Sequence, residues 1–409
     1  MKQVWILNHY AQIPQEAGGT RHFHLAQYLQ SLGWRATIIA ASVNHNTGQQ
    51  RLNLHEFTRY EEISRVPFLW VHTPEYTGNG RGRLLNILTY AWNVWQRRTT
   101  AQLHRPDVVV GSSVHPLAGV VAFLLAHRFK VPFVFEVRDL WPQTLVDMGR
   151  LKESSIMTLL FRKLESWLYR RASCIVVLLP YASDYIMPLG IAKDKIVWIP
   201  NGVDLSLFPL SSACFNKTGE AFIIMYFGAI GLANGLEDVI LAMKLIQEKG
   251  NRYGISLRII GEGPLKGELI ELAKRLGLEN ISFEPSVKKS EIPLLAAQAD
   301  AFVIAVLNLP GLYRYGISMN KLYDYLAAAR PIIIASDAAN NPVDEANAGI
   351  TVRPGNSEEL ADAMLRMAEM SRHEREEMGR NGRVYVEQFH SFKSLSGKFA
   401  DVLDIVYSS

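Results

Sequence analysis

The sequence predicts an α/β protein with two doubly wound, Rossmann-like domains that face each other across a cleft. In both halves of the chain, short apolar runs alternate with helical patterns, and a segment without periodicity separates the halves. Alternating strands and helices are typical of a parallel sheet with helices on both faces. The length of 409 residues agrees, because it exceeds one ordinary core and fits two domains of roughly 200 residues each.

The apolar runs are the predicted strands. In the first half they are Val4–Leu7, Ala36–Ala40, Val108–Val110, Phe133–Val137, Ile175–Leu178 and Ile196–Ile199. In the second half they are Ile223–Phe227, Leu257–Ile260, Ile281–Phe283, Ala301–Ile304, Ile332–Ile334 and Ile350–Val352. Residues 201–220 are rich in Gly, Pro, Ser and Asn, which predicts an interdomain linker.

We place the domain boundary near Asp204, which gives domains over residues 1–204 and 205–390. The chain is helical in pattern from Glu358 to Ser409, and residues 391–409 are expected to form a helix that returns to the first domain. In open parallel sheets, ligands bind beyond the carboxyl ends of the strands. The loops after the strands are therefore where functional residues are expected.

Composition excludes several classes of protein. Hydrophobic residues make up 48% and charged residues 20%, which argues against disorder. The net charge of +4 is mild, and without a zinc-finger or aromatic-basic RNA motif it does not suggest nucleic acid as a partner. The first apolar run is too short for a secretory signal, and no run is long enough to span a membrane, so a cytoplasmic protein is expected. Cys174 and Cys214 lack metal or redox spacing.

Three segments of the first half follow predicted strands. Gly18 and Gly19 precede a helix expected to begin near Thr20, where free N–H groups could meet a phosphate, although a plain tight turn explains the pair as well. In VFEVRDLWPQ the charged residues Glu136, Arg138 and Asp139 stand at a strand end, which suits a polar pocket or a structural ion pair. His115 also follows a strand, with Pro116 opening a helix. A lone histidine is more often structural.

The second half has a glycine-rich loop that leads from a strand into a helix and again aims N–H groups at an anion. This loop holds Gly228, Gly231, Asn234 and Gly235. Glu262 lies in a second such loop, between Gly261 and Gly263, which could also be a structural turn.

A helix start holds Asn320, Lys321 and Asp324. Lys321 and Asp324 are three residues apart and share a face. A cation for a diphosphate beside a carboxylate for ribose hydroxyls is what a nucleotide-sugar site needs; a surface ion pair is the alternative.

Five segments resemble, in order and spacing, those of glycosyltransferase family 4. They are IPNGVD, YFGAIG, IIGEGPLKGEL, LLAAQADAFVI and YDYLAAARPII. The resemblance implies a retaining enzyme of the GT-B fold whose first domain binds the acceptor and whose second binds a nucleotide sugar. The segments WILNHYAQIP, GGTRHFHLA and EVRDLWPQ resemble bacterial surface-polysaccharide enzymes, of O-antigen or capsule, that include N-acetyl-L-fucosamine transferases. This implies a UDP-linked donor and a lipid-linked glycan acceptor.

The sequence departs from the family pattern at several positions. Of two glutamates eight residues apart, the family's ribose contact carries over to Asp324, whereas the sugar contact falls on Gly316. The family's basic pair on the phosphates falls on Ala229 and Asn234, and Lys321 is the candidate replacement. Where many members have a histidine before an aspartate, this chain has Arg138 before Asp139, so the role of that pair must be argued from its chemistry.

A nucleotide diphosphate leaving group needs stabilisation of its departing oxygen. Helix N-termini and Lys321 can supply this without metal, and since the sequence has no Asp-x-Asp, no metal or other cofactor is expected. The expected function is therefore metal-independent transfer of a sugar. Two alternatives stay open. One is a nucleotide-sugar epimerase, which would need no acceptor, and the other is a degenerate nucleotide-sugar-binding subunit, which would give no product.

The segment from residue 79 to 106 has five arginines and no acidic residue, and an apolar stripe at helical spacing. The arginines are Arg81, Arg83, Arg97, Arg98 and Arg105, and the stripe is Leu84, Ile87, Leu88, Ala91 and Trp95, with Trp92 nearby. Such a helix fits the surface of an anionic membrane, which predicts peripheral contact with the inner face of the cytoplasmic membrane. The alternative is that the stripe packs into the domain core.

Overall fold

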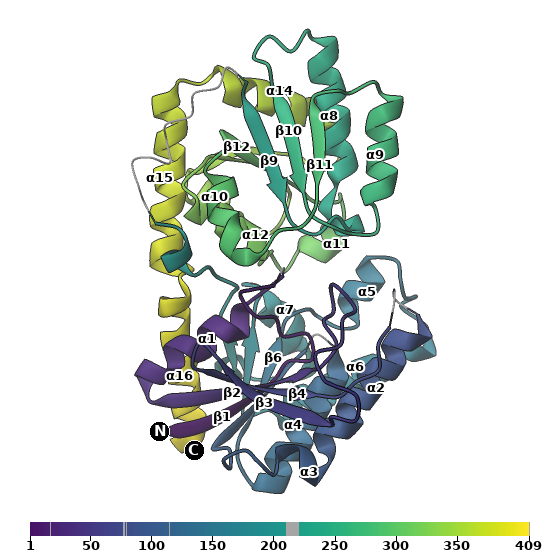
Figure 1. Ribbon diagram of the computed structural model, residues 1–409, viewed down its shortest axis with the longest axis vertical. Helices are drawn as coiled ribbons and strands as arrows, with labels where there is room; N and C mark the ends of the chain where they lie inside the picture. Colours follow the sequence, from purple (N-terminus) through teal and green to yellow (C-terminus); the bar gives the residue numbers. More distant parts are fainter. Residues whose placement is uncertain (17, 77, 79, 114, 210–220, 409) are drawn as a thin grey trace. The chain divides into compact units, whose positions relative to one another are not determined.

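The computed structural model describes residues 1–16, 18–76, 78, 80–113, 115–209 and 221–408 (Figure 1). Residues 210–220 of the expected linker, including Cys214, lie outside the described residues. The chain divides into two compact units. The first contains residues 1–14, 18–200 and the C-terminal helix, and the second contains residues 201–391.

The described part of the first unit is built on an eight-stranded sheet in the order β3-β4-β2-β1-β5-β6-β7-β8. Its strands are β1 (Lys2–Leu7), β2 (Trp34–Ala41), β3 (Thr58–Ile63), β4 (Val66–Val71), β5 (Val108–Ser112), β6 (Phe133–Val137), β7 (Cys174–Val177) and β8 (Ile196–Trp198). Its helices are α1 (Arg21–Leu29), α2 (Arg81–Trp95), α3 (Arg97–Thr100), α4 (Pro116–Phe129), α5 (Gln143–Asp147), α6 (Ile156–Arg171), α7 (Ala182–Ile186) and α16 (Phe392–Ser408).

Helices cover both faces of this sheet because successive strand side chains point to opposite sides. Val4 and Ile6 of β1 share a core cluster with residues of α1 and α16. Trp5, between them, packs edge-on against Phe129 at the end of α4, and α4 also contacts α2 and α6. Figure 1 shows α1 beside α16, with α2, α4 and α6 together on the other side of the strands.

The described part of the second unit is a six-stranded, wholly parallel sheet in the order β11-β10-β9-β12-β13-β14. Its strands are β9 (Ile223–Phe227), β10 (Ser256–Ile260), β11 (Ile281–Glu284), β12 (Ala301–Ala305), β13 (Ile332–Ala335) and β14 (Gly349–Val352). Its helices are α8 (Leu236–Glu248), α9 (Lys266–Arg275), α10 (Ile292–Ala296), α11 (Pro310–Tyr313), α12 (Asn320–Ala327), α13 (Pro342–Glu345), α14 (Ser357–Glu369) and α15 (Arg372–Phe389). Helices α8, α9 and α14 share one core cluster, and α10, α12 and α15 share another.

Each predicted strand overlaps an observed one, and the prediction of two parallel-sheet domains is confirmed. Strands β3 and β4 were not among the predicted strands, and they add an antiparallel pair at one edge of the first sheet. Their turn contains Ser64 and Arg65, both at positive φ, instead of the glycine or asparagine that usually marks such a turn. The sequence therefore carried no ordinary hairpin signal there. No helix in the described ranges is long and apolar enough to cross a membrane.

Candidate active site

Two glycine loops interlock at the carboxyl edge of the second sheet. The loop after β9 and the loop after β10 exchange backbone hydrogen bonds, from Gly228 N to Ile260 O (3.0 Å) and from Ile230 N to Glu262 O (2.9 Å). A Cβ on Gly261 would lie 1.9 Å from the carbonyl oxygen of Gly228, and one on Gly263 would lie 2.2 Å from that of Ile230. The two loops therefore have no room for side chains where they meet. Together they form a backbone surface before α8, called here the glycine platform.

Lys321, near the start of α12, reaches this platform. Its Nζ donates to Tyr226 Oη at 2.8 Å and to the side-chain oxygen of Asn234, which lies two residues before α8. The Asn234 amide in turn donates to the carbonyl of Ala229 at 2.9 Å. Burial lowers the pKa of the Lys321 amino group to about 7. Among the described residues no carboxylate pairs with Lys321, so an anion at the N-terminus of α8 would meet an uncompensated cation.

Asp324 faces a different partner. It is buried on α12, and Lys289 donates to its Oδ2. Its Oδ1 is also buried but has no hydrogen-bond partner among the described residues, so it has capacity to accept a hydroxyl. Burial raises the pKa of this carboxyl, and the Lys289 charge opposes that shift. Sequence reasoning missed Lys289, because a lysine in a run such as VKKSE reads as a solvated charge.

The remaining predicted residues of the second unit lie in loops or at helix starts. Asn320 is the first residue of α12 and is half-buried, and Glu262 is exposed and accepts a hydrogen bond from Lys266 at 2.7 Å. Gly231 precedes the short turn that leads to α8. Gly316 has φ of 97°, a conformation that favours glycine, at the position where the family carries its sugar-binding glutamate.

In the first unit the three charged residues of the EVRD segment have different environments, and only Glu136 is part of the buried core. Glu136 is fully buried and accepts hydrogen bonds from Arg21 Nε at 2.8 Å and His22 Nε2 at 2.6 Å. Burial opposes its ionisation, but the positive charges of His22 and Arg21 hold the pKa of the Glu136 carboxyl well below its usual range. Glu136 therefore connects β6 to α1 through an ion pair with Arg21. Arg21 lies 115 residues away in the chain, and the sequence did not indicate it as the partner.

Arg138 and Asp139 lie beyond this ion pair, at the end of β6. Ser113 Oγ accepts a hydrogen bond from the Arg138 backbone N–H at 3.1 Å, which fixes the loop against the end of β5. The Asp139 side chain is exposed, and it lines a small recess with Trp141. Gly18, with φ of 127°, and the half-buried Gly19 both precede α1. These residues occupy the strand-end loops where the sequence analysis expected a site.

His115 belongs to a buried chain of hydrogen bonds. Its Nδ1 accepts from the backbone N–H of Ala118 at 3.3 Å and so caps α4, and its Nε2 lies 2.5 Å from Nδ1 of His9. The other nitrogen of His9 lies 2.7 Å from the side-chain oxygen of Asn86. Burial lowers the pKa of His115 to about 3. Both of its ring nitrogens are therefore engaged inside the protein, with the imidazole neutral at neutral pH.

The comparison with known families agrees with the two-unit division of the structure. Residues 17–202 match the glycosyl transferase 4-like domain, and residues 221–370 match the domain of glycosyl transferases group 1. The chain is a glycosyltransferase. Each unit of the enzyme thus carries its own glycosyltransferase domain. The first match ends at the start of the expected linker, and the second begins directly after it.

Two bacterial proteins are similar to this chain in sequence. The enzyme is 24% identical to the probable glycosyltransferase WbjE of Pseudomonas aeruginosa, over 67% of this chain and 69% of that protein. It is 26% identical to the putative colanic acid biosynthesis glycosyl transferase WcaI of Escherichia coli (strain K12), over 28% of this chain and 29% of that protein.

Solved structures share the fold. Sucrose-phosphate synthase from Thermosynechococcus elongatus matches with a TM-score of 0.78 and 16% identity, over the whole of both chains. Anabaena HepE in complex with UDP and glucose matches with a TM-score of 0.70 and 16% identity, over 99% of this chain and 100% of that chain. The GT-B fold expected for this glycosyltransferase is confirmed.

Proposed function

We propose that this glycosyltransferase moves a sugar, with retention of configuration and without a metal, from a UDP-linked donor to a lipid-linked glycan acceptor. The process would be the assembly of a bacterial surface polysaccharide, O-antigen or capsule, as the sequence resemblance implies. The relative WcaI, a putative glycosyl transferase of colanic acid biosynthesis, supports a role of this kind. N-acetyl-L-fucosamine is the first donor sugar to test, as the sequence resemblance implies. The observation that carries the proposal is the uncompensated Lys321 above the glycine platform.

The described contacts support a division of labour among the residues. Lys321 and the N-terminus of α8 would stabilise the diphosphate as the bond from its oxygen to the anomeric carbon breaks. Asp324 would accept a ribose hydroxyl on its Oδ1, which has no hydrogen-bond partner among the described residues. The acceptor hydroxyl forms the new bond to the anomeric carbon, and its proton passes to the departing phosphate oxygen. Asp139 and Arg138, exposed or half-buried at the end of β6, are assigned to the transferred sugar.

A thermal-shift panel tests the donor assignment. UDP-sugars should stabilise the enzyme more than GDP- or ADP-sugars, since a ligand that binds only the folded state raises its stability. Lys321→Ala should weaken binding of UDP about tenfold, the typical effect of losing a charge-assisted contact. Lys249→Ala, which removes an exposed lysine paired with Asp362, is the matched control. Equal affinity in the two variants would overturn the assignment, and product analysis with and without acceptor separates transfer from epimerisation or mere binding.

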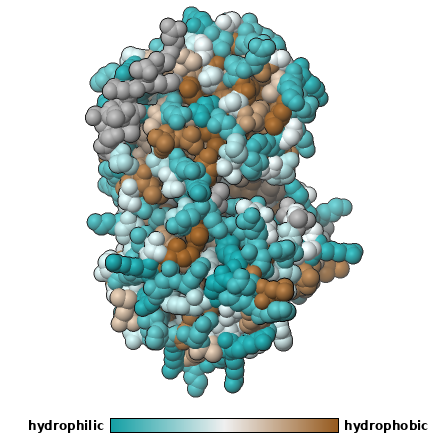
Figure 2. Space-filling view, in the orientation of Figure 1, coloured by the Kyte–Doolittle hydropathy of each residue, from teal (hydrophilic) through white to brown (hydrophobic). Residues whose placement is uncertain are grey.

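Helix α2 supports contact with a membrane because large apolar side chains are exposed on it, although it also buries Tyr90 and Val94. Asn86 and Asn93 are buried, whereas Leu84 and Trp92 are 56% and 65% exposed. The Asn86 and Asn93 amides donate to the carbonyls of Pro74 and His72, so the polar side chains are satisfied inside the fold. The predicted stripe therefore does not form the core of the unit. Figure 2 shows hydrophobic side chains at the right edge, over the region of α2 in Figure 1.

Helix α6, beside α4, also combines a buried face that includes Leu168 and Tyr169 with exposed apolar residues, and α4 is the helix that α2 also contacts. Helix α6 buries Thr158 and Glu165 as well and exposes four large apolar residues. These are Ile156, Met157, Leu159 and Leu160. Exposed apolar side chains on two helices, together with the arginines of the α2 segment, fit the interface of an anionic leaflet.

Sedimentation with anionic vesicles tests this contact. The variant with Arg81, Arg83, Arg97 and Arg98 all changed to serine should bind far more weakly, because each basic residue near the surface contributes about 1 kcal/mol. A control variant loses the same charge from the second unit, by serine at Lys249, Arg252, Lys274 and Arg275, all exposed. Equal sedimentation of both variants, or no binding by the unmodified enzyme at low salt, would point to an acceptor in solution.

A further inference from the structure

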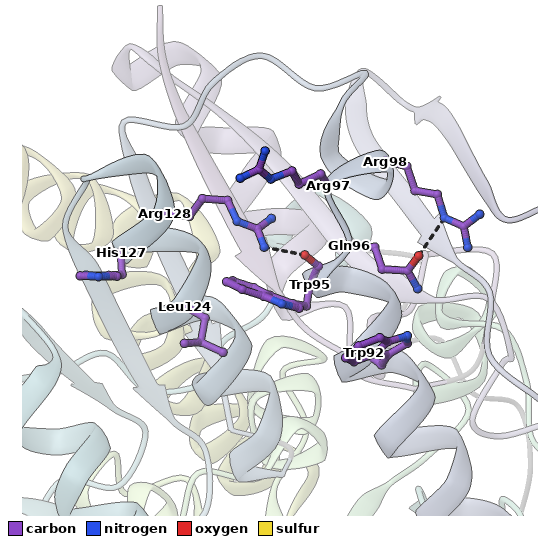
Figure 3. Close-up of a pocket in the computed structure, with 8 residues that line it drawn as sticks. All are labelled: Trp92, Trp95, Gln96, Arg97, Arg98, Leu124, His127 and Arg128. Carbon is purple, nitrogen blue, oxygen red and sulfur yellow. Dashed lines mark hydrogen bonds between the residues drawn. The ribbon is translucent and has the colours of Figure 1, made fainter.

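An open recess of about 680 Å³ lies on the first unit between the C-terminal ends of α2 and α4 and the start of α3. Its lining combines basic and aromatic side chains: Trp92, Trp95, Gln96, Arg97, Arg98, Leu124, His127 and Arg128. In Figure 3, Arg128 reaches from α4 towards the end of α2 and lies over the Trp95 ring, with its guanidinium 3.6 Å from the ring centroid. The recess has no acidic residue in its lining.

The arginines of this recess are only partly satisfied by the protein. Arg128 Nη2 donates to the Trp95 carbonyl at 2.8 Å and so caps α2, but Nη1 is buried without a hydrogen-bond partner among the described residues. Arg98 donates to Gln96 at 2.9 Å, and no ion pair is formed by Arg97, Arg98 or Arg128 in the described ranges. Burial lowers the pKa of the Arg128 guanidinium, and the nearby Arg97 charge lowers it further. Three arginines therefore line the recess without a carboxylate partner among the described residues, with the Arg98 guanidinium lying over the Phe57 ring.

The recess lies away from the candidate active site. Helix α4 begins at Pro116, just after β5, and ends at Phe129, so its C-terminal end is about 20 Å from the carboxyl edge of the sheet at 1.5 Å per residue. His127 and Arg128 are at that far end. An anion bound there could not take part in sugar transfer. The recess nevertheless adjoins the exposed apolar face, because Trp92 belongs to both.

From this we infer that the recess holds the phosphodiester headgroup of one anionic phospholipid. Nη1 of Arg128 and the Arg97 guanidinium would donate to the phosphate oxygens, for which arginine is suited, and Arg98 would add positive charge beside them. Trp92 and Trp95 supply amphipathic rings at the level where headgroups and acyl chains meet. A soluble phosphate would use the arginines alone, whereas the adjoining Leu88 and Trp92 favour a ligand with acyl chains. This inference rests on the proposed membrane contact and gives it a specific site.

Titration with a short-chain lipid below its micelle concentration tests the site without a membrane. Dihexanoyl phosphatidylglycerol should bind the full-length enzyme, as measured by calorimetry, and dihexanoyl phosphatidylcholine should bind much more weakly. Arg128→Gln should weaken phosphatidylglycerol binding about tenfold, the usual scale for a lost charge-assisted hydrogen bond. Arg97→Gln with Arg98→Gln should weaken it at least as much. Arg105→Gln is the matched control, since Arg105 is exposed, donates to the Phe129 carbonyl and does not line the recess.

The outcomes separate this site from membrane contact in general. Loss in the recess variants but not in Arg105→Gln supports a headgroup site. Equal affinity in all variants overturns it, as does equal binding of phosphatidylcholine. Inorganic phosphate that binds as tightly as phosphatidylglycerol overturns the lipid assignment. Vesicle sedimentation is measured in parallel, so an enzyme that sediments with anionic vesicles but does not bind the short-chain lipid keeps the membrane contact and loses the site.

Discussion

The two units treat charge differently at the carboxyl ends of their strands. In the first, the buried carboxylate of Glu136 accepts hydrogen bonds from the Arg21 guanidinium and a ring N–H of His22. In the second, Lys321 meets only the neutral side chains of Tyr226 and Asn234. A buried charge that the fold compensates serves the structure, whereas a cation left with neutral partners suits a ligand of opposite charge. The difference separates residues expected to govern stability from residues expected to govern binding.

The largest effect is expected from Glu136→Gln. It leaves Arg21 buried without a carboxylate, and breaking a buried ion pair typically costs about 3 to 5 kcal/mol. Urea unfolding should show this loss. Glu62→Gln removes the exposed pair with Arg35 and should cost less than about 1 kcal/mol. If both variants were equally stable, the Glu136 cluster would not be the structural element that its burial suggests.

Asp139→Asn sharpens the comparison within the first unit, since Asp139 lies three residues from Glu136 but is exposed. We expect a fall in kcat of about a hundredfold, the lower range for a group that acts in the transition state. Affinity for the donor and the urea midpoint should change little. Normal turnover in a folded variant would assign Asp139 to the surface only.

Lys321 should make nucleotide binding depend on pH. Its pKa of about 7 in the free enzyme rises when a diphosphate binds, so binding takes up a proton above pH 7. Affinity for UDP should therefore fall as pH rises from 7.5 to 9, by up to about tenfold per unit. Calorimetry in buffers of different ionisation enthalpy measures the proton directly. Lys321→Arg stays charged and should abolish the uptake; if the uptake persisted, another group would be its source.

The smallest expected effect is that of a chelator. If Lys321 and the start of α8 stabilise the leaving group, EDTA should leave the initial rate of transfer unchanged. Dialysed enzyme with and without EDTA provides the measurement. Complete loss of activity, restored by magnesium or manganese, would mean that a metal stabilises the leaving group. The contrast drawn between Lys321 and the Glu136 cluster would then not explain catalysis.

Much of the fold follows from local patterns in the sequence. The apolar runs mark the strands because parallel strands covered on both faces must be apolar throughout, and the loops ahead of α1, α4, α8 and α12 were located by glycine, proline and polar residues. The same patterns drew attention to Lys321 and Asp324. The hairpin of β3 and β4 was missed because Ser64 and Arg65 occupy its turn.

Only the tertiary structure decided which residues meet and which face of a helix is buried. Arg21 pairs with Glu136 and Lys289 with Asp324 across long stretches of chain, and no spacing rule connects such positions. Periodicity found the apolar stripe of α2 but could not tell that Asn86 and Asn93 face inward, because that depends on how the loop before α2 folds back to present the His72 and Pro74 carbonyls. Sequence determines local conformation and the carboxyl edge where a site lies; partners brought together by folding determine whether a charge there is compensated or open to a ligand.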